Sequence, residues 1–165
     1  MKSSGNSVLF GIIGMLLSSV GALITISNTQ KLLFLVGALF LITSSIIEKH
    51  FLYTCLQGII IAGTVVAFLP VSGHFKALVP LLGGIIFMIV SYPKFRNKPN
   101  EFIGALGVIT IGAGFAVSHP VIYFTGALMV AIYSLLEFYK GVKIALLWLI
   151  LNSIFAVTAI VAILQ

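Results

Sequence analysis

The last apolar stretch of the sequence carries two polar side chains that could bind a solute. Trp148 and Asn152 are four residues apart, so they lie on one face of the helix predicted there. An amide surrounded by hydrocarbon loses several kcal/mol of hydrogen bonding, and Asn152 therefore needs a partner from a neighbouring helix, from water or from a ligand. Two roles fit this pattern: an amide that joins two helices, or a binding site in which the indole stacks on a flat solute.

A second amide, Gln57, occupies a comparable place in an earlier apolar stretch. Gln57 follows Lys49 by eight residues, as Asn152 follows Lys143 by nine. We expect the two amides to face each other and to bind a polar, mostly uncharged small solute, with Trp148 stacking on it. The alternative is that each amide only bonds to a neighbouring helix, which contributes about 1 kcal/mol per bond.

Two hydroxyls and two carboxyls complete the candidate residues. Tyr133 and Ser44 occupy corresponding positions in the internal repeat described below, and we expect them to line the same cavity; the alternative is packing, with hydroxyls bonded to the preceding turn. Glu48 and Glu137 lie at the ends of their predicted helices, each close to a lysine. They are either interfacial partners of those lysines or carboxylates that gate the protein or carry protons.

The sequence offers little for covalent chemistry. It has no aspartate, a single cysteine inside an apolar run, and three histidines that fall in different predicted loops. No Ser/His/Asp set, metal-ligand spacing or phosphate-binding glycine loop is recognisable. We therefore expect no catalytic residue, no metal, no cofactor and no enzymatic activity.

The composition predicts an integral membrane protein. Of the 165 residues 61% are hydrophobic and 7% are charged, and the mean hydropathy is +1.26. A soluble domain has about 25% charged residues, so this chain could not cover its surface in water. We expect the lipid bilayer to be its partner. The net charge of +6 then reflects membrane orientation and does not indicate nucleic acid.

Polar residues divide the chain into seven apolar runs. Crossing a membrane takes roughly 20 helical residues. The second and fourth runs are short, so we expect them to need a thinned bilayer or support from neighbours, and six spans result if short runs fuse. The runs are 8–26, 32–47, 51–69, 77–92, 102–118, 121–138 and 142–164.

Basic residues between the runs predict the orientation. Seven lie on one side and two on the other, which places the amino terminus in the cytoplasm and the carboxyl terminus outside. We expect a multi-pass protein of the cell membrane, most simply a bacterial inner membrane. The first group is Lys2, Lys49, Lys94, Arg96, Lys98, Lys140 and Lys143, and the second is Lys31 and Lys76.

An internal repeat divides the single transmembrane domain, residues 1–165. The string Gly-Ala-Leu followed by a glutamate occurs at Gly37 and again at Gly126, 89 residues later, and Ile13-Gly14 matches Ile103-Gly104. The sequence therefore predicts a parallel 3+1+3 arrangement, an architecture that transporters use. Its parts are 8–69, a connecting helix at 77–92, and 102–164. A rival periodicity of about 45 residues between lysines fits three hairpins plus one helix.

The second predicted repeat resembles the SWEET/SemiSWEET/PQ-loop superfamily, which includes PnuC-type permeases. The strings GAL, YSLL, YKG and LNSIFA between Gly126 and Ala156 carry this resemblance. It implies transport, with Asn152 at the substrate site and Gln57 where the first repeat would carry its amide. A competing resemblance, to HdeD-type small membrane proteins, is carried by Gly63, Pro70 and the glycine pair at 83–84.

Two functions follow as expectations. The first is a small-solute transporter that alternates access between two three-helix bundles. The second is a non-enzymatic membrane protein, either HdeD-like or an accessory subunit of a membrane complex. Both leave room for a homo-oligomer or a membrane partner.

Overall fold

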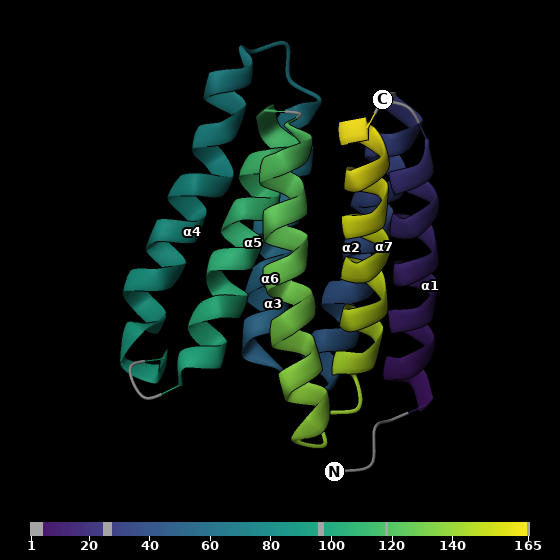
Figure 1. Ribbon diagram of the computed structural model, residues 1–165, viewed down its shortest axis with the longest axis vertical. Helices are drawn as coiled ribbons and strands as arrows, with labels where there is room; N and C mark the ends of the chain where they lie inside the picture. Colours follow the sequence, from purple (N-terminus) through teal and green to yellow (C-terminus); the bar gives the residue numbers. More distant parts are fainter. Residues whose placement is uncertain (1–4, 25–27, 96–97, 118, 165) are drawn as a thin grey trace.

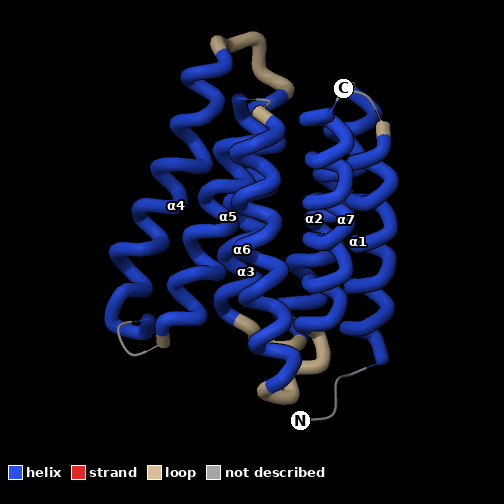
Figure 2. Tube along the Cα trace, viewed as in Figure 1, coloured by secondary structure: helices blue, strands red, loops and turns tan. Residues whose placement is uncertain are grey.

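The protein is a bundle of α-helices. The computed structural model describes residues 5–24, 28–95, 98–117 and 119–164, in which there are seven helices and no strand. Figures 1 and 2 show the helices running up and down side by side. The predicted all-helical class is confirmed. The helices are α1 (Gly5–Leu23), α2 (Asn28–Ile47), α3 (Phe51–Ala67), α4 (Gly73–Phe95), α5 (Pro99–Val117), α6 (Pro120–Tyr139) and α7 (Ala145–Leu164).

The helices formed from the two short predicted runs, 32–47 and 77–92, are longer than those runs. α2 has 20 residues and α4 has 23, because their polar first turns, from Asn28 and from Gly73, are helical. The expectation that these two elements are too short to cross a membrane unaided is wrong. The N–H groups in the first turn of a helix have no partner within the helix and are satisfied by water or by polar side chains. Polar residues can therefore form the first turn of a helix whose remaining residues are apolar. Pro99 opens α5, at a position where its missing N–H costs nothing.

Six of the helices close into a ring. Consecutive helices pack together within α1–α3 and within α5–α7, while α3 packs against α5 and α7 packs against α1. α4 packs against α3 and α5, and Figure 1 shows it on the outside of the bundle. The six helices of the ring therefore enclose an interior, and α4 lies outside the ring.

The surface is apolar, and many polar side chains are inside. Ile89 and Val90 of α4 expose 69% and 67% of their surface, while Gln57 and Asn152 expose 1% and 3%. Such a distribution suits hydrocarbon and not water. Within the described residues, four helices are long and apolar enough to cross a membrane, as a membrane protein requires: α1, α2, residues 73–93 of α4, and α6. The shorter apolar helices are 51–67 and 145–161.

Glycines bring two pairs of helices into backbone contact. A Cβ atom on Gly14 of α1 would lie 2.7 Å from the carbonyl oxygen of Gly37 of α2. Likewise, a Cβ atom on Gly126 of α6 would lie 2.6 Å from the carbonyl oxygen of Gly107 of α5. Both approaches are closer than any larger residue permits. In membranes such small-residue crossings let helices pack tightly where no hydrophobic effect drives them together.

The second crossing gives a direct test of the packing. Gly126→Ala would push its methyl group into the backbone of α5, which has no flexible side chain to yield, so the helices must separate. We expect a loss of roughly 1–3 kcal/mol, the usual cost of overpacking, measured as a lower midpoint of thermal unfolding in detergent. Gly58→Ala is the matched control, because nothing lies within 4 Å of the added atom. Equal midpoints for the two variants would contradict the close crossing.

Candidate functional site

Three aromatic rings form a layer across the interior of the ring of helices. Tyr53 of α3 lies flat on Trp148 of α7, with ring centroids 4.5 Å apart and an angle of 2° between the planes. Tyr133 of α6 meets Tyr53 edge-on at 5.6 Å. The Tyr53 hydroxyl donates a hydrogen bond of 3.2 Å to the Oγ atom of Ser134. All three rings are at most 3% exposed. We call Tyr53, Tyr133 and Trp148 the aromatic layer.

Above this layer lies a small cavity, the central cavity, where the two predicted amides meet. Its volume is about 20 Å³, enough for one water molecule. Trp148 lines it from the side of the aromatic layer. All six ring helices contribute to its wall, through Ser18, Ala38, Gln57, Ile111, Val130 and Asn152 among others. The structure therefore brings Gln57, Trp148 and Asn152 together, as the sequence predicted.

The two amides differ in how their polar atoms are satisfied. The Nδ2 atom of Asn152 donates a hydrogen bond of 2.8 Å to the backbone oxygen of Trp148, one turn earlier in the same helix. The Oε1 atom of Gln57 is buried and has no hydrogen-bond partner among the described residues. A buried acceptor without a donor costs about 1–3 kcal/mol. Gln57 is therefore the group in the central cavity that a water or a solute donor would satisfy.

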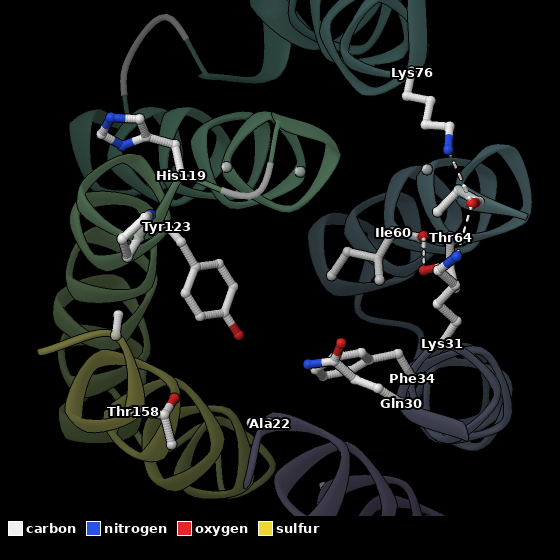
Figure 3. A pocket seen from close by; sticks show the side chains of 16 residues that line it. Ala22, Gln30, Lys31, Phe34, Ile60, Thr64, Lys76, His119, Tyr123 and Thr158 are labelled. Carbon is white, nitrogen blue, oxygen red and sulfur yellow. Dashed lines mark hydrogen bonds between the residues drawn. The ribbon is translucent and has the colours of Figure 1, made fainter. Parts of the chain in front are cut away.

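A second and much larger cavity, the wide cavity, lies at the end of the bundle where α3 finishes and α6 begins. Its volume is about 520 Å³, within the range of small-molecule sites. Figure 3 shows Tyr123 of α6 and Gln30 of α2 projecting into it from opposite sides. Phe34 and Ile60 line both cavities, so the two adjoin at these side chains.

The other predicted residues lie at or near the opposite end of the bundle. Tyr133 belongs to the aromatic layer, and neither it nor Ser44 lines either cavity. Ser44 instead donates a hydrogen bond of 2.7 Å to the backbone oxygen of Ser7 in α1. Glu48 accepts a hydrogen bond from the Ser7 hydroxyl, and Glu137 forms an ion pair of 2.7 Å with Lys140. Neither of these carboxylates lines either cavity.

A histidine lies against the far side of the aromatic layer. The His50 ring, in the turn before α3, stacks on Tyr53 with centroids 4.2 Å apart. Burial lowers the pKa of this imidazole, and the negative charge of Glu137 opposes that change. His50 is therefore favoured in its neutral form at the closed end of the interior.

Sequence reasoning missed Tyr53, the direct partner of Trp148. The signal was present, because Tyr53 precedes Gln57 by four residues just as Trp148 precedes Asn152 by four. One helical turn separates the ring from the amide in each helix. The pairing of an aromatic ring with an amide one turn later thus occurs once in α3 and once in α7.

Comparisons of this chain with protein-family models, with curated proteins and with solved structures found no match. Among the residues that the structure describes, no group of three or more His, Cys, Asp or Glu side chains is placed to hold a metal ion.

The arrangement predicts which positions water reaches. In a Cys55→Ser background, Thr64→Cys in the wall of the wide cavity should react with a charged, water-soluble thiol reagent. Ser134→Cys is the matched position beneath the aromatic layer, where the side chain is 0% exposed, and it should stay unmodified until the protein is denatured. Labelling is measured by mass spectrometry of the protein in detergent. Comparable rates at the two positions would show that the aromatic layer does not close the interior.

Proposed function

We propose that this protein is a small-solute transporter of the cell membrane. Two bundles, α1–α3 and α5–α7, alternate the access of a central site, and α4 connects them. All seven helices cross the membrane in this proposal, and the chemistry is binding and movement without a covalent step. The observation that carries the proposal is the pair of matching units, Tyr53 with Gln57 and Trp148 with Asn152: their rings stack on each other, and their amides line one cavity.

The aromatic contact supports a two-fold repeat. If α3 and α7 occupy equivalent places in two similar bundles, their ring-and-amide units face each other across the pseudo-symmetry axis. Tyr53 and Trp148 are stacked in this way, and Gln57 and Asn152 line the same small space. The packing of α3 on α5 and of α7 on α1 agrees with such an axis, because one contact becomes the other when the bundles are exchanged.

The helix crossings support the same repeat. The contact of Gly14 with Gly37 in the first bundle corresponds to that of Gly107 with Gly126 in the second. This matching pairs Gly14 with Gly107, one turn further along than the sequence match with Gly104. The rival division into three hairpins has less support, because α3 and α4 make no such tight crossing: Gly63 would bring a Cβ atom only to 3.9 Å from Pro80.

The two cavities support alternating access. The wide cavity lies above the central site, and the aromatic layer lies below it. This arrangement is that of a transporter open to one side, whose opposite state requires the aromatic layer to part and the wide cavity to narrow. The two amides favour a polar solute whose body is mostly uncharged. The resemblance to the SWEET and PnuC group points the same way and places Asn152 in the substrate site.

A substitution at Gln57 separates a binding role from a structural one. Gln57→Leu removes an acceptor that lacks a donor, so the melting temperature without solute should be unchanged or higher. Screening sugars, amino acids and vitamins by thermal shift should find a solute that stabilises the wild type by about 2.7 kcal/mol at 100 times its Kd. Gln57→Leu and Asn152→Ala should lose both that shift and uptake into proteoliposomes.

The control for these variants is Ser153→Ala. The Ser153 side chain is exposed on α7, and its hydroxyl donates a hydrogen bond to the backbone oxygen of Leu149 in the same helix, so uptake and stability should stay at the wild-type level. A fall of several degrees in the melting temperature of Gln57→Leu would show that the Gln57 amide stabilises the protein through an interhelical hydrogen bond. A protein that no solute stabilises would favour the alternative, a non-enzymatic membrane protein of the HdeD kind or an accessory subunit.

The proposed orientation is tested with reporter fusions in a bacterium. Basic residues gather at the end of the bundle that holds Glu48 and Glu137, which supports a cytoplasmic location for that end. Alkaline phosphatase fused after Gln165 should be active, and the same enzyme fused after Gly141, in the α6–α7 turn, should be inactive although expressed. The opposite pattern would reverse the inside and outside of the protein.

A further inference from the structure

Among the described residues that line the wide cavity there are positively charged side chains and no carboxylate. Lys31, Lys76 and His119 line it. The chain has three acidic residues, all glutamates, and each lies towards the opposite end of the bundle, at the end of α2, at the start of α5 or at the end of α6. No acidic side chain is therefore placed to neutralise the two lysines. A cavity with apolar walls and charge of one sign attracts solutes of the opposite sign.

The two lysines converge on one atom. The Nζ atoms of Lys31 and Lys76 lie 3.2 Å and 3.3 Å from the backbone oxygen of Ala67, in the last turn of α3. Figure 3 shows them approaching this oxygen from two directions at the α3 side of the cavity. Each ammonium group has three N–H donors. The Nζ atom of Lys31 also lies 5.5 Å from the centre of the Phe68 ring. A neutral carbonyl and a neutral ring do not balance two positive charges.

The rest of the cavity wall suits a polar organic molecule. Thr64, Thr158 and the amide of Gln30 are among its polar groups, and Phe34 and Tyr123 contribute aromatic surface. Figure 3 shows the Tyr123 hydroxyl and the Gln30 amide directed towards the space between the helices. A solute there has its charged end near the lysines and its body near Phe34, beyond which lies the central cavity.

We infer that the wide cavity binds anions, with a carboxylate or phosphate group held between Lys31 and Lys76. This inference deepens the proposed function, on which it rests for the view that the cavity leads to the central site. It also narrows the solute class: a mostly uncharged polar body, as the amides favour, together with one acidic group. The acidic group comes either from a soluble solute or from the headgroup of an anionic lipid.

The experiment compares probes that differ in charge alone. Benzoate, benzamide and benzylamine share one ring and carry a negative, a neutral and a positive group, and inorganic phosphate tests the anion without a ring. Binding is measured by titration calorimetry on the purified protein in a nonionic detergent at constant ionic strength. We expect at least one of the two anions to bind ten or more times more tightly than benzamide, and benzylamine not to bind.

Variants assign this preference to the lysines. K31Q/K76Q should lose the preference for anions, whereas K31R/K76R, which keeps both charges, should retain it and control for folding. Lys143→Gln, an exposed lysine at the opposite end, should bind as the wild type does. Equal affinity of the wild type for benzoate, phosphate and benzamide would overturn the inference, as would an anion preference that survives K31Q/K76Q.

A lipid arm identifies the source of the acidic group. The affinity for a soluble anion is compared between nanodiscs of phosphatidylglycerol and nanodiscs of phosphatidylcholine. If a lipid headgroup occupies the lysines, the affinity should be lower in phosphatidylglycerol. If the natural ligand is a soluble solute, the affinity should be the same in both. Either result supports an anion site. Uptake separates this inference from the transporter proposal. Anion binding without uptake would contradict the transporter proposal and leave the anion site standing. Uptake that K31Q/K76Q does not change would support the transporter proposal and contradict the anion site.

Discussion

A helix in hydrocarbon has spare hydrogen-bond acceptors but no spare donors, and this asymmetry decides which polar groups matter here. Beyond the first turn, each backbone N–H is used within the helix, whereas each carbonyl oxygen retains a second lone pair. Hydroxyl groups on the helices bond to this second lone pair. Thr43, Thr110 and Thr125 each donate to the carbonyl oxygen four residues earlier, at 2.8–2.9 Å. Asn152 does the same with its amide nitrogen. An acceptor such as Oε1 of Gln57 cannot be satisfied in this way, because its own helix offers no free N–H. It therefore lacks a hydrogen-bond donor among the described residues.

The glycine crossings determine where that group lies. Backbone contact at Gly37 and at Gly126 holds α2 close to α1 and α6 close to α5, so each pair behaves as one unit. α3 and α7 then complete the ring between these pairs. Their inward faces meet at the axis of the bundle, which is why the side chains of Tyr53 and Trp148 stack there and why only small voids remain beside them. Closure below the amides and openness above them follow from the size of these two rings.

The sequence predicted the helical class and the location of the amides because both depend on local patterns. The spacing of Trp148 and Asn152 along one helix, and the cost of an amide in lipid, point inward whatever the neighbours are. Ser44 and Tyr133 were harder to place because their surroundings depend on packing. Tyr133 faces α5, where its ring would be 2.7 Å from a Cβ atom on Gly104. The convergence of Lys31 and Lys76 on Ala67 was not predictable. The two lysines are 36 and 9 residues from Ala67 and belong to two other helices, so their meeting depends on how three helices pack.

The stacked pair at the base of the central cavity has a practical consequence. Trp148 is the single tryptophan of the chain, so ultraviolet fluorescence excited at the red edge of absorption originates from one position, in face-to-face contact with Tyr53. Emission wavelength and intensity depend on the polarity and on the neighbours of the indole. The unlabelled protein therefore contains an optical reporter beside Gln57 and Asn152, and its signal would change if a molecule bound there or if the two rings separated.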